Sequence, residues 1–403
     1  MSDSRHPDSL QASSALIPFI NLGHVLDHLL MLIYPTLVLA MSAEFGMSFS
    51  ELLPLSIGGF IAFGAGSLPA GWLADRWSRR NMMLVFFIGI GAATILTGFA
   101  RTPAQIAAGL TLMGLFASIY HPVGISMLVA GRDKVGKLLG VNGVYGNLGV
   151  GFAAVTAGAL ADSVGWRAAF FVPGAVAIAA GIAFAMVIPQ ARNAGVAAAR
   201  PRVAIPRDTM VRVFFVLTFA TICNGVIYNA ATISMPKMFE ERIGDLTGST
   251  MGIGALVSMV YLFAACAQYI VGHLIDRFSL RNVFLPLAAM QVPLLLIAGA
   301  VGNYTILLVA VPMMFFIFGV IPINDAMVAK YTDEHWRSRV YAVRFVISFS
   351  ASACAVPLVA YLYRSSGGFS EVYLVLAAVA AVCTAAAWFF PRTRQPAALA
   401  ESA

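Results

Sequence analysis

The chain has 403 residues, of which 60% are hydrophobic and only 11% are charged. This composition excludes a water-soluble globular protein, because such proteins carry about 25% charged residues. The net charge of +7 does not indicate a nucleic-acid partner either, since the basic residues are spread over loops and are not gathered on one face.

Apolar runs of roughly 20 residues predict helices that cross a lipid bilayer. The chain has twelve of them, at 14–41, 51–73, 81–100, 104–130, 138–161, 167–189, 210–234, 249–274, 282–301, 304–329, 340–363 and 370–390. Six fall in each half. We therefore expect an all-α membrane protein with twelve transmembrane helices in two pseudo-symmetric halves of six.

The loops predict the domain organisation and the orientation in the membrane. We expect a cytoplasmic tail at 1–13, an N-terminal six-helix bundle at 14–189, a cytoplasmic linker at 190–209, a C-terminal six-helix bundle at 210–390 and a second cytoplasmic tail at 391–403. The polar start lacks a basic region and a cleavage site, so the first span is predicted to be uncleaved. Of the 25 lysines and arginines, 19 lie on the side of the tails and 5 on the other side. Positive charge is retained in the cytoplasm, which predicts cytoplasmic termini and a multi-pass protein of the cell inner (plasma) membrane.

One loop sequence occurs twice. GWLADRWSRRN at 71–81 returns as GHLIDRFSLRN at 272–282, with seven identical residues that are all 201 positions apart. Each copy follows an apolar stretch long enough to cross a bilayer. Two matched membrane-embedded halves are typical of secondary transporters, because a site between the halves can open to either side of the membrane.

These loops carry a family resemblance. The segment GxLADRxSRR between spans two and three, with its echo between spans eight and nine, resembles the cytoplasmic-loop signature of the major facilitator superfamily, and GWRAAFFVPG at 165–174 is also similar to that family's pattern. The resemblance covers the whole chain. More narrowly, SIYHPVG at 118–124 and GNLG at 146–149 resemble the fosmidomycin-resistance-like branch of drug exporters. The superfamily resemblance implies that spans one, four, seven and ten line a central cavity.

The resemblance also implies a gating role for the repeated loops. The family's loop carboxylate latches one half to the other, so Asp75 would engage the start of span eleven near 339–343, and Asp276 would engage span five near Leu138. A carboxylate is stabilised by the unpaired N–H groups at the start of a helix. The alternative is that these loops only fix the topology through their positive charge. The predicted gating residues are Gly71, Asp75, Arg76, Arg80, Gly272, Asp276, Arg277 and Arg281.

The first span carries the densest group of polar residues within the predicted helices. Asn21, His24, Asp27 and His28 recur at three- and four-residue steps, so they share one helical face, and His121 lies at a comparable depth in span four. Ionisable groups inside a membrane are costly and are functional by default. We predict that Asp27, partly desolvated and inclined to hold its proton, is the coupling carboxylate, and that the three histidines share or relay this proton.

Two other interpretations of the same residues stay open. A polar face can join helices by hydrogen bonds without any transport role. Alternatively His24, Asp27, His28 and His121 could be metal ligands, since His at positions i and i+4 can face one ion.

The remaining polar residues of the predicted cavity are candidates for substrate binding. Tyr228 and Asn229 lie 201 positions after Asp27 and His28, so the second half keeps a polar pair without its ionisable character. Asp325 and Arg344 could form a buried ion pair, although Arg344 could instead snorkel to the headgroups. The full predicted set is Asn21, Tyr34, Tyr120, Asn142, Tyr145, Asn224, Tyr228, Asn229, Asp325 and Arg344.

Span five is rich in glycine, at 140, 143, 146, 149, 151 and 158. Small residues let helices approach closely, so we expect this span to pack at the interface between the halves. Superfamily antiporters carry a glycine pattern ending in Gly-Pro-x-x-Gly-Gly in this span. Here Ala153, Ala154 and Ala157 stand where Gly, Pro and Gly are expected, and Gly158 is retained, so the chain departs from the antiporter pattern.

Motifs of other protein classes are missing from the sequence. There is no GxxxxGK[ST] for ATP and no GxSxG nucleophile, and the four cysteines lack CxxC spacing. We therefore predict no enzyme and no cofactor. We predict a monomeric, proton-coupled transporter in the lipid bilayer that works by alternating access and exports a small organic compound of drug- or siderophore-like type by proton antiport. The alternative is an importer of a transition metal or a metal chelate.

Overall fold

The structure is a computed structural model that describes residues 15–130, 136–190, 207–331 and 334–391. Side chains are described in these ranges except at 136–137, 207, 329–330, 334–339, 341–342, 345, 349 and 352. In this part of the chain all regular structure is helical, and 12 helices are long and apolar enough to cross a membrane. The predicted fold class is confirmed. The predicted domain bounds stay predictions, because residues 191–206 of the linker lie outside the described residues.

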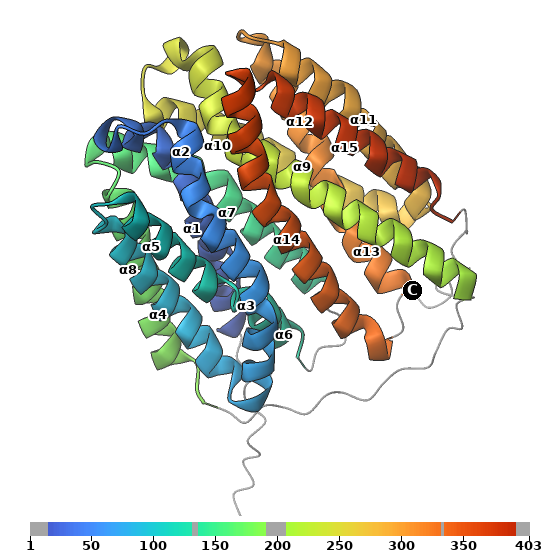
Figure 1. The fold of residues 1–403 in the computed structure, drawn as a ribbon. Helices are drawn as coiled ribbons and strands as arrows, with labels where there is room; N and C mark the ends of the chain where they lie inside the picture. Colours follow the sequence, from blue (N-terminus) through green and yellow to red (C-terminus); the bar gives the residue numbers. More distant parts are fainter. Residues whose placement is uncertain (1–14, 131–135, 191–206, 332–333, 392–403) are drawn as a thin grey trace, which may run out of the picture.

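The two halves form two groups of helices side by side, the first in blue and green and the second in yellow to red in Figure 1. The first half comprises α1 (Leu16–Phe45), α2 (Phe49–Leu52), η1 (Leu53–Ser56), α3 (Ile57–Arg76), α4 (Arg79–Gly98), α5 (Pro103–Ala117), η2 (Tyr120–Gly124), α6 (Ile125–Val129), α7 (Gly136–Ser163) and α8 (Ala168–Val187). The second half comprises α9 (Arg207–Thr247), α10 (Thr250–Arg277), α11 (Leu280–Ala300), α12 (Thr305–Gly319), α13 (Ile321–Tyr331), α14 (Glu334–Ser366) and α15 (Ser370–Trp388).

Proline interrupts the corresponding spans of both halves. Span four widens into one turn of π-helix, η2, around Pro122, and span ten breaks between α12 and α13 just before Pro322. Proline has no N–H to donate and its ring clashes with the preceding turn, so it locally disrupts a helix. π-Helical turns occur frequently at functional sites. Both breaks carry polar side chains, His121 in the first half and Asn324 with Asp325 in the second.

Helix α9 continues well beyond the predicted end of span seven at 234, and reaches Thr247 through a kink at Ile243, where the backbone is not helical (φ −143°, ψ 15°). The prediction stopped there because the sequence becomes charged. The structure shows why the helix continues: Lys237 forms ion pairs with Glu240 and, at 3.8 Å, with Glu241. Charge pairs three and four residues apart stabilise a helix, so polar composition does not end this one.

Helix packing repeats between the halves. In the first half α1 packs on α7, α4 on α8, and α3 on α5. The corresponding pairs of the second half are α9 with α14, α11 with α15, and α10 with α12. Contacts between the halves follow the same rule, through α7 with α10 and α3 with α14. The duplicated sequence therefore builds a duplicated packing scheme.

The seam between α7 and α10 combines close backbone approach with polar contacts. A Cβ on Gly158 would lie 2.4 Å from the Thr250 carbonyl oxygen, so only glycine allows this approach. Asp162 Oδ2 accepts a hydrogen bond from the Met251 N–H at 2.6 Å, and Gln268 Nε2 donates to Asn147 Oδ1 at 3.1 Å. This seam holds the two halves together.

The glycines of α7 divide between two partners, which corrects the expectation that they all serve the interface between the halves. Gly151 and Gly158 do face α10, but Gly146 and Gly149 face α1 within the first half. Around Gly140 and Gly143 no atom lies within 4 Å of an added Cβ. The glycine pattern thus brings α7 close to two helices at once.

The repeated loops bind mainly to their own half in the described residues. Asp75 pairs with Arg79 at 2.8 Å and is 66% exposed. Arg80 donates to the carbonyl oxygens of Ile188 at 2.6 Å and Ala185 at 2.7 Å, at the end of α8. A cation is favourable at a helix C-terminus. Arg281 repeats this placement in the second half, where its guanidinium stacks on Trp388 at 5.0 Å.

The predicted latches between the halves are not seen in the described residues. Asp276 is exposed and has no hydrogen bond or ion pair with another described residue, and the side chain of Arg339 lies outside them. The remaining predicted gating residues Gly71, Arg76, Gly272 and Arg277 are half-buried or exposed at the same helix ends. Their gating role stays a prediction.

Candidate functional site

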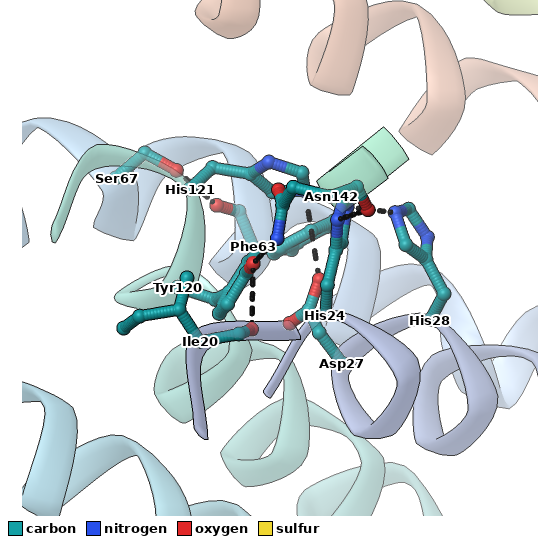
Figure 2. Close-up of polar contacts among 9 residues, drawn as sticks. All are labelled: Ile20, His24, Asp27, His28, Phe63, Ser67, Tyr120, His121 and Asn142. Atoms are coloured by element: carbon teal, nitrogen blue, oxygen red, sulfur yellow. Dashed lines mark hydrogen bonds and ion pairs between the residues drawn. The ribbon is translucent and has the colours of Figure 1, made fainter. Parts of the chain in front are cut away.

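The polar face of α1 meets the π-helical turn of span four, as Figure 2 shows. Three imidazoles and one carboxyl group come together there, from His24, Asp27 and His28 of α1 and from His121 of η2. We call these four residues the His/Asp cluster. His24, Asp27 and His121 are buried and His28 is half-buried, so His28 is the most accessible member. The sequence-predicted grouping across spans one and four is therefore present in space.

A backbone carbonyl group fixes the tautomer of His24. Its Nδ1 lies 2.7 Å from the carbonyl oxygen of Asn142, which can only accept a hydrogen bond, so Nδ1 carries the proton. In a neutral ring Nε2 is then an acceptor. It lies 3.1 Å from Nε2 of His28, which therefore donates to it. The two imidazoles form a short hydrogen-bonded chain from the half-buried edge of the cluster to its buried interior.

Asn142 of α7 ties three helices together beside this chain. Its Nδ2 donates to Asn21 Oδ1 at 3.0 Å and to the Tyr120 hydroxyl oxygen at 2.9 Å. The Tyr120 hydroxyl in turn donates to the carbonyl oxygen of Ile20 at 3.0 Å. Three residues predicted to bind substrate, Asn21, Tyr120 and Asn142, therefore make their hydrogen bonds to one another and to the backbone. In this conformation they position the cluster.

Asp27 has the least satisfied environment in the cluster. Its side chain is 0% exposed, and neither carboxyl oxygen has a hydrogen-bond partner in the described part of the chain. Its nearest charged or chargeable neighbour is Nε2 of His121, 3.5 Å from Oδ2. An isolated buried carboxylate is very costly. The geometry therefore requires a proton within the Asp27 and His121 pair.

Glycines of α7 provide the space for the first-span imidazoles. A Cβ on Gly146 would lie 2.6 Å from both Cε1 and Nε2 of His24, and one on Gly149 would lie 2.3 Å from the Val25 carbonyl oxygen. Any larger residue would push α7 away from α1 or displace the ring. These glycines are not among the residues that the sequence predicts for the site. The four-residue step from Asn142 to Gly146 was the available signal, because it places both on one face of α7.

The imidazoles also have a geometry that a metal ion could use. One ligand nitrogen from each of His24, His28 and His121 can be chosen so that all three lie within 4.8 Å of one another. Imidazole nitrogen suits Zn²⁺ and its first-row neighbours, and a His whose other nitrogen donates to a carbonyl oxygen, as in His24, is oriented as metal ligands commonly are. The cluster can thus hold either protons or a divalent ion.

A second charged group lies in the other half. Arg344 of α14 and Asp325 of α13 form an ion pair at 2.7 Å, which confirms the predicted pairing. The two side chains differ in exposure, at 12% for Arg344 and 48% for Asp325. The second half therefore holds a charge pair of its own, between α13 and α14.

The other predicted substrate-binding residues lie outside both groups. The Tyr34 hydroxyl donates to the Leu52 carbonyl oxygen at 2.7 Å, and Asn229 donates to Gly225 in its own helix at 2.9 Å. Tyr228 packs its ring on Phe318 at 5.2 Å. Asn224 accepts a long contact from the Cys383 thiol at 3.9 Å, and Tyr145 is exposed. Tyr228 and Asn229, which correspond to Asp27 and His28 in the duplication, therefore do not form a second proton site with the described residues around them.

Sequence comparison places the chain in a family. A profile of the Major Facilitator Superfamily matches residues 23–244 and 217–403. The fold agrees: a bacterial homolog of the human lysosomal transporter Spinster, solved in an inward-facing and unoccupied conformation, superposes with a TM-score of 0.71 at 14% identity, over 94% of each chain. A D-xylose-proton symporter gives a TM-score of 0.73 at 15% identity, over 94% of this chain and 98% of that one.

Curated relatives match at low identity and over part of their length. The puromycin resistance protein pur8 of Streptomyces alboniger is 26% identical over 63% of this chain and 44% of its own length. The tetracenomycin C resistance and export protein of Streptomyces glaucescens is 28% identical over 38% of this chain and 29% of its own length. The matches thus span less than half of either relative.

These findings define a polytopic membrane protein of a transporter family. The chain belongs to the Major Facilitator Superfamily. The narrower resemblance to its fosmidomycin-resistance-like branch stays a prediction.

Proposed function

We propose that this protein is a proton-coupled secondary transporter that exports a small organic compound by alternating access. The observation that carries the proposal is Asp27: a fully buried carboxyl group, 3.5 Å from His121, for which the described part of the chain offers no hydrogen bond to either oxygen. Intramembrane ionisable groups that lack a permanent counter-charge are typical of proton relays. Export is supported by relatives whose names describe antibiotic resistance and export.

The coupling step follows from the order of the imidazoles. A proton that reaches half-buried His28 passes to His24 through their hydrogen bond. A rearrangement of the cluster then carries it to Asp27 and His121, which lie 3.5 Å apart and have no hydrogen bond to His24 among the described residues. Neutralising Asp27 lowers the cost of enclosing it in a dry interface. Rocking of the halves about the seam between α7 and α10 then releases the proton to the cytoplasm while substrate leaves through the opposite gate.

The substitution Asp27→Asn tests the coupling. In cells lacking other exporters, we expect the wild-type protein to drive efflux of dyes and antibiotics, puromycin among them, that stops when an uncoupler is added. Asp27→Asn should abolish this efflux, because the amide cannot release a proton. It should still allow substrate to move down its own concentration gradient, because the amide mimics the protonated acid. Asp208→Asn removes an exposed carboxylate at the start of α9 and should behave as wild type. Undiminished uncoupler-sensitive efflux by Asp27→Asn would refute the assignment.

A second candidate is uptake of a transition metal or a metal chelate, favoured by the three imidazoles within 4.8 Å of one another. Elemental analysis of cells with and without the protein separates the two functions. Uptake predicts a rise in one first-row metal that His121→Gln abolishes, whereas drug export predicts unchanged metal content.

A further inference from the structure

A groove lies between α9 and α14 in the second half, beside the ion pair. Its volume is about 230 Å³, somewhat below the ~300–1,000 Å³ of typical ligand pockets. It therefore fits a small compound or one end of a larger one. On the α9 side the lining residues are Phe214, Leu217, Thr218 and Thr221. On the α14 side Val340, Val343, Arg344 and Ile347 line it. Each set follows steps of three, one and three, which is one face of an α-helix.

The crossing of the two helices explains why the groove exists. A Cβ on Gly225 would lie 2.9 Å from Cβ of Ala351, so α9 and α14 touch closely there. The groove-lining residues of both helices precede this crossing point in sequence, by one to three turns. The helices diverge from the crossing toward their beginnings, and the space between them is lined by side chains.

The groove has a polar end on an otherwise apolar wall. Arg344 supplies a guanidinium group, and on the α9 wall the described lining carries no charge. The Thr221 hydroxyl is buried and has no hydrogen-bond partner among the described residues. Threonine in a helix can donate to its own backbone, as Thr232 does at 2.6 Å. A buried hydroxyl left unsatisfied is costly, so Thr221 offers a hydrogen bond to a ligand.

We propose, building on the transport function above, that this groove binds the carboxylate end of an amphipathic organic acid. Arg344 holds the carboxylate through parallel N–H bonds, a geometry that guanidinium and carboxylate share, and Thr221 donates to it. The apolar body lies against Phe214, Leu217 and Ile347. Asp325 pairs with Arg344 when the groove is empty, and because its side chain is 48% exposed it has room to move away when the substrate acid replaces it.

Replacement of the Asp325 carboxylate by the substrate carboxylate also keeps the charge of Arg344 neutralised. The guanidinium group keeps a negative partner before and after substrate binds, so its charge is never left unpaired in the membrane. The substrate class proposed is therefore an organic anion with an aromatic or aliphatic body.

Binding of a matched pair of probes tests this proposal. Isothermal titration of the purified full-length protein in detergent would compare 2-naphthoate with its neutral isostere 2-naphthamide. We expect naphthoate to bind at least tenfold more tightly, and Arg344→Gln to lose about tenfold or more of its affinity, because hydrogen bonds to charged groups are the strong ones. Asp325→Asn removes the competing acid and should bind naphthoate several-fold more tightly than wild type.

Controls separate the groove from general effects. Arg212→Gln removes an exposed arginine of α9 outside the groove and should not change either affinity. Thr221→Val keeps the shape and should weaken naphthoate severalfold with no effect on naphthamide, which gives an independent test if Arg344→Gln does not fold. Equal affinity for the two probes, or naphthoate binding that neither Arg344→Gln nor Thr221→Val weakens, overturns the proposal. Binding is measured without a proton gradient, so its failure is distinct from a failure of Asp27-dependent coupling.

Discussion

The two halves share a packing scheme but treat ionisable groups in opposite ways. In the first half Asp27 is fully buried with a histidine 3.5 Å away as its only charge partner in the described residues. In the second half Asp325 is half-exposed and bonded to a permanent cation at 2.7 Å. The first arrangement changes its charge when one proton moves, whereas the second keeps both charges. Duplication therefore preserved the scaffold while the halves took different electrostatic roles, one suited to protons and the other to an anionic ligand.

The largest effect on transport and stability is expected from filling the space beside the His24 ring. Gly146→Ala would place a methyl group 2.6 Å from Nε2 of His24, so the ring must leave its bond with His28 or α7 must move. We expect transport to fall about tenfold or more and the unfolding free energy to fall by about 1–3 kcal/mol. Efflux and chemical unfolding in detergent measure the two effects.

Gly143→Ala is the matched control, one helical turn earlier on α7. No atom lies within 4 Å of its added Cβ, so transport should be unchanged, and stability should rise by up to about 1 kcal/mol from helix propensity. Equal transport and equal stability of the two variants would show that the space beside the His24 ring is not required for function.

An intermediate effect is expected at the ion pair. Asp325→Asn breaks the 2.7 Å ion pair with Arg344, whose side chain is 12% exposed, and should cost about 1–2 kcal/mol. Fully buried pairs cost ~3–5 kcal/mol when broken, but Asp325 is half in contact with solvent. A double-mutant cycle with Arg344→Gln, read by unfolding, should give a coupling energy of about 1 kcal/mol. A coupling energy of about 3–5 kcal/mol, as for a fully buried pair, would mean that Asp325 is as strongly desolvated as Asp27 and that the halves do not differ in this respect.

The smallest effect is expected at the seam, away from both groups. Asp162→Asn weakens the carboxylate bond to the first turn of α10 and should cost about 0.5–1 kcal/mol. Ser163→Ala is the control, since that hydroxyl bonds only to the Ala159 carbonyl oxygen of its own helix. Naphthoate affinity should be unchanged in both. A change in affinity with Asp162→Asn would show that the seam is coupled to the groove.

Particular residues show how far the sequence could predict the site. Periodicity placed His24, Asp27 and His28 on one face, because a helix repeats every 3.6 residues whatever surrounds it. The resemblance to a known family brought span four, and with it His121, to the same place. The role of Asn142 was predicted as substrate binding, yet its bonds to Asn21 and Tyr120 make it a positioning residue. The sequence around Asn142 does not distinguish substrate binding from positioning, because the two roles differ only in which groups of the folded protein hydrogen-bond to its amide.

The sequence by itself determined the twelve spans, the duplication and the placement of titratable groups within the spans, because hydropathy and helical period are local properties of the chain. The tertiary structure decided which of those groups meet. It left Asp27 without a hydrogen bond to any described residue, paired Arg344 with Asp325, and opened a groove where α9 diverges from α14. These outcomes depend on distances between helices, set by close contacts at Gly146, Gly149 and Gly225, and such distances are a property of the packed whole.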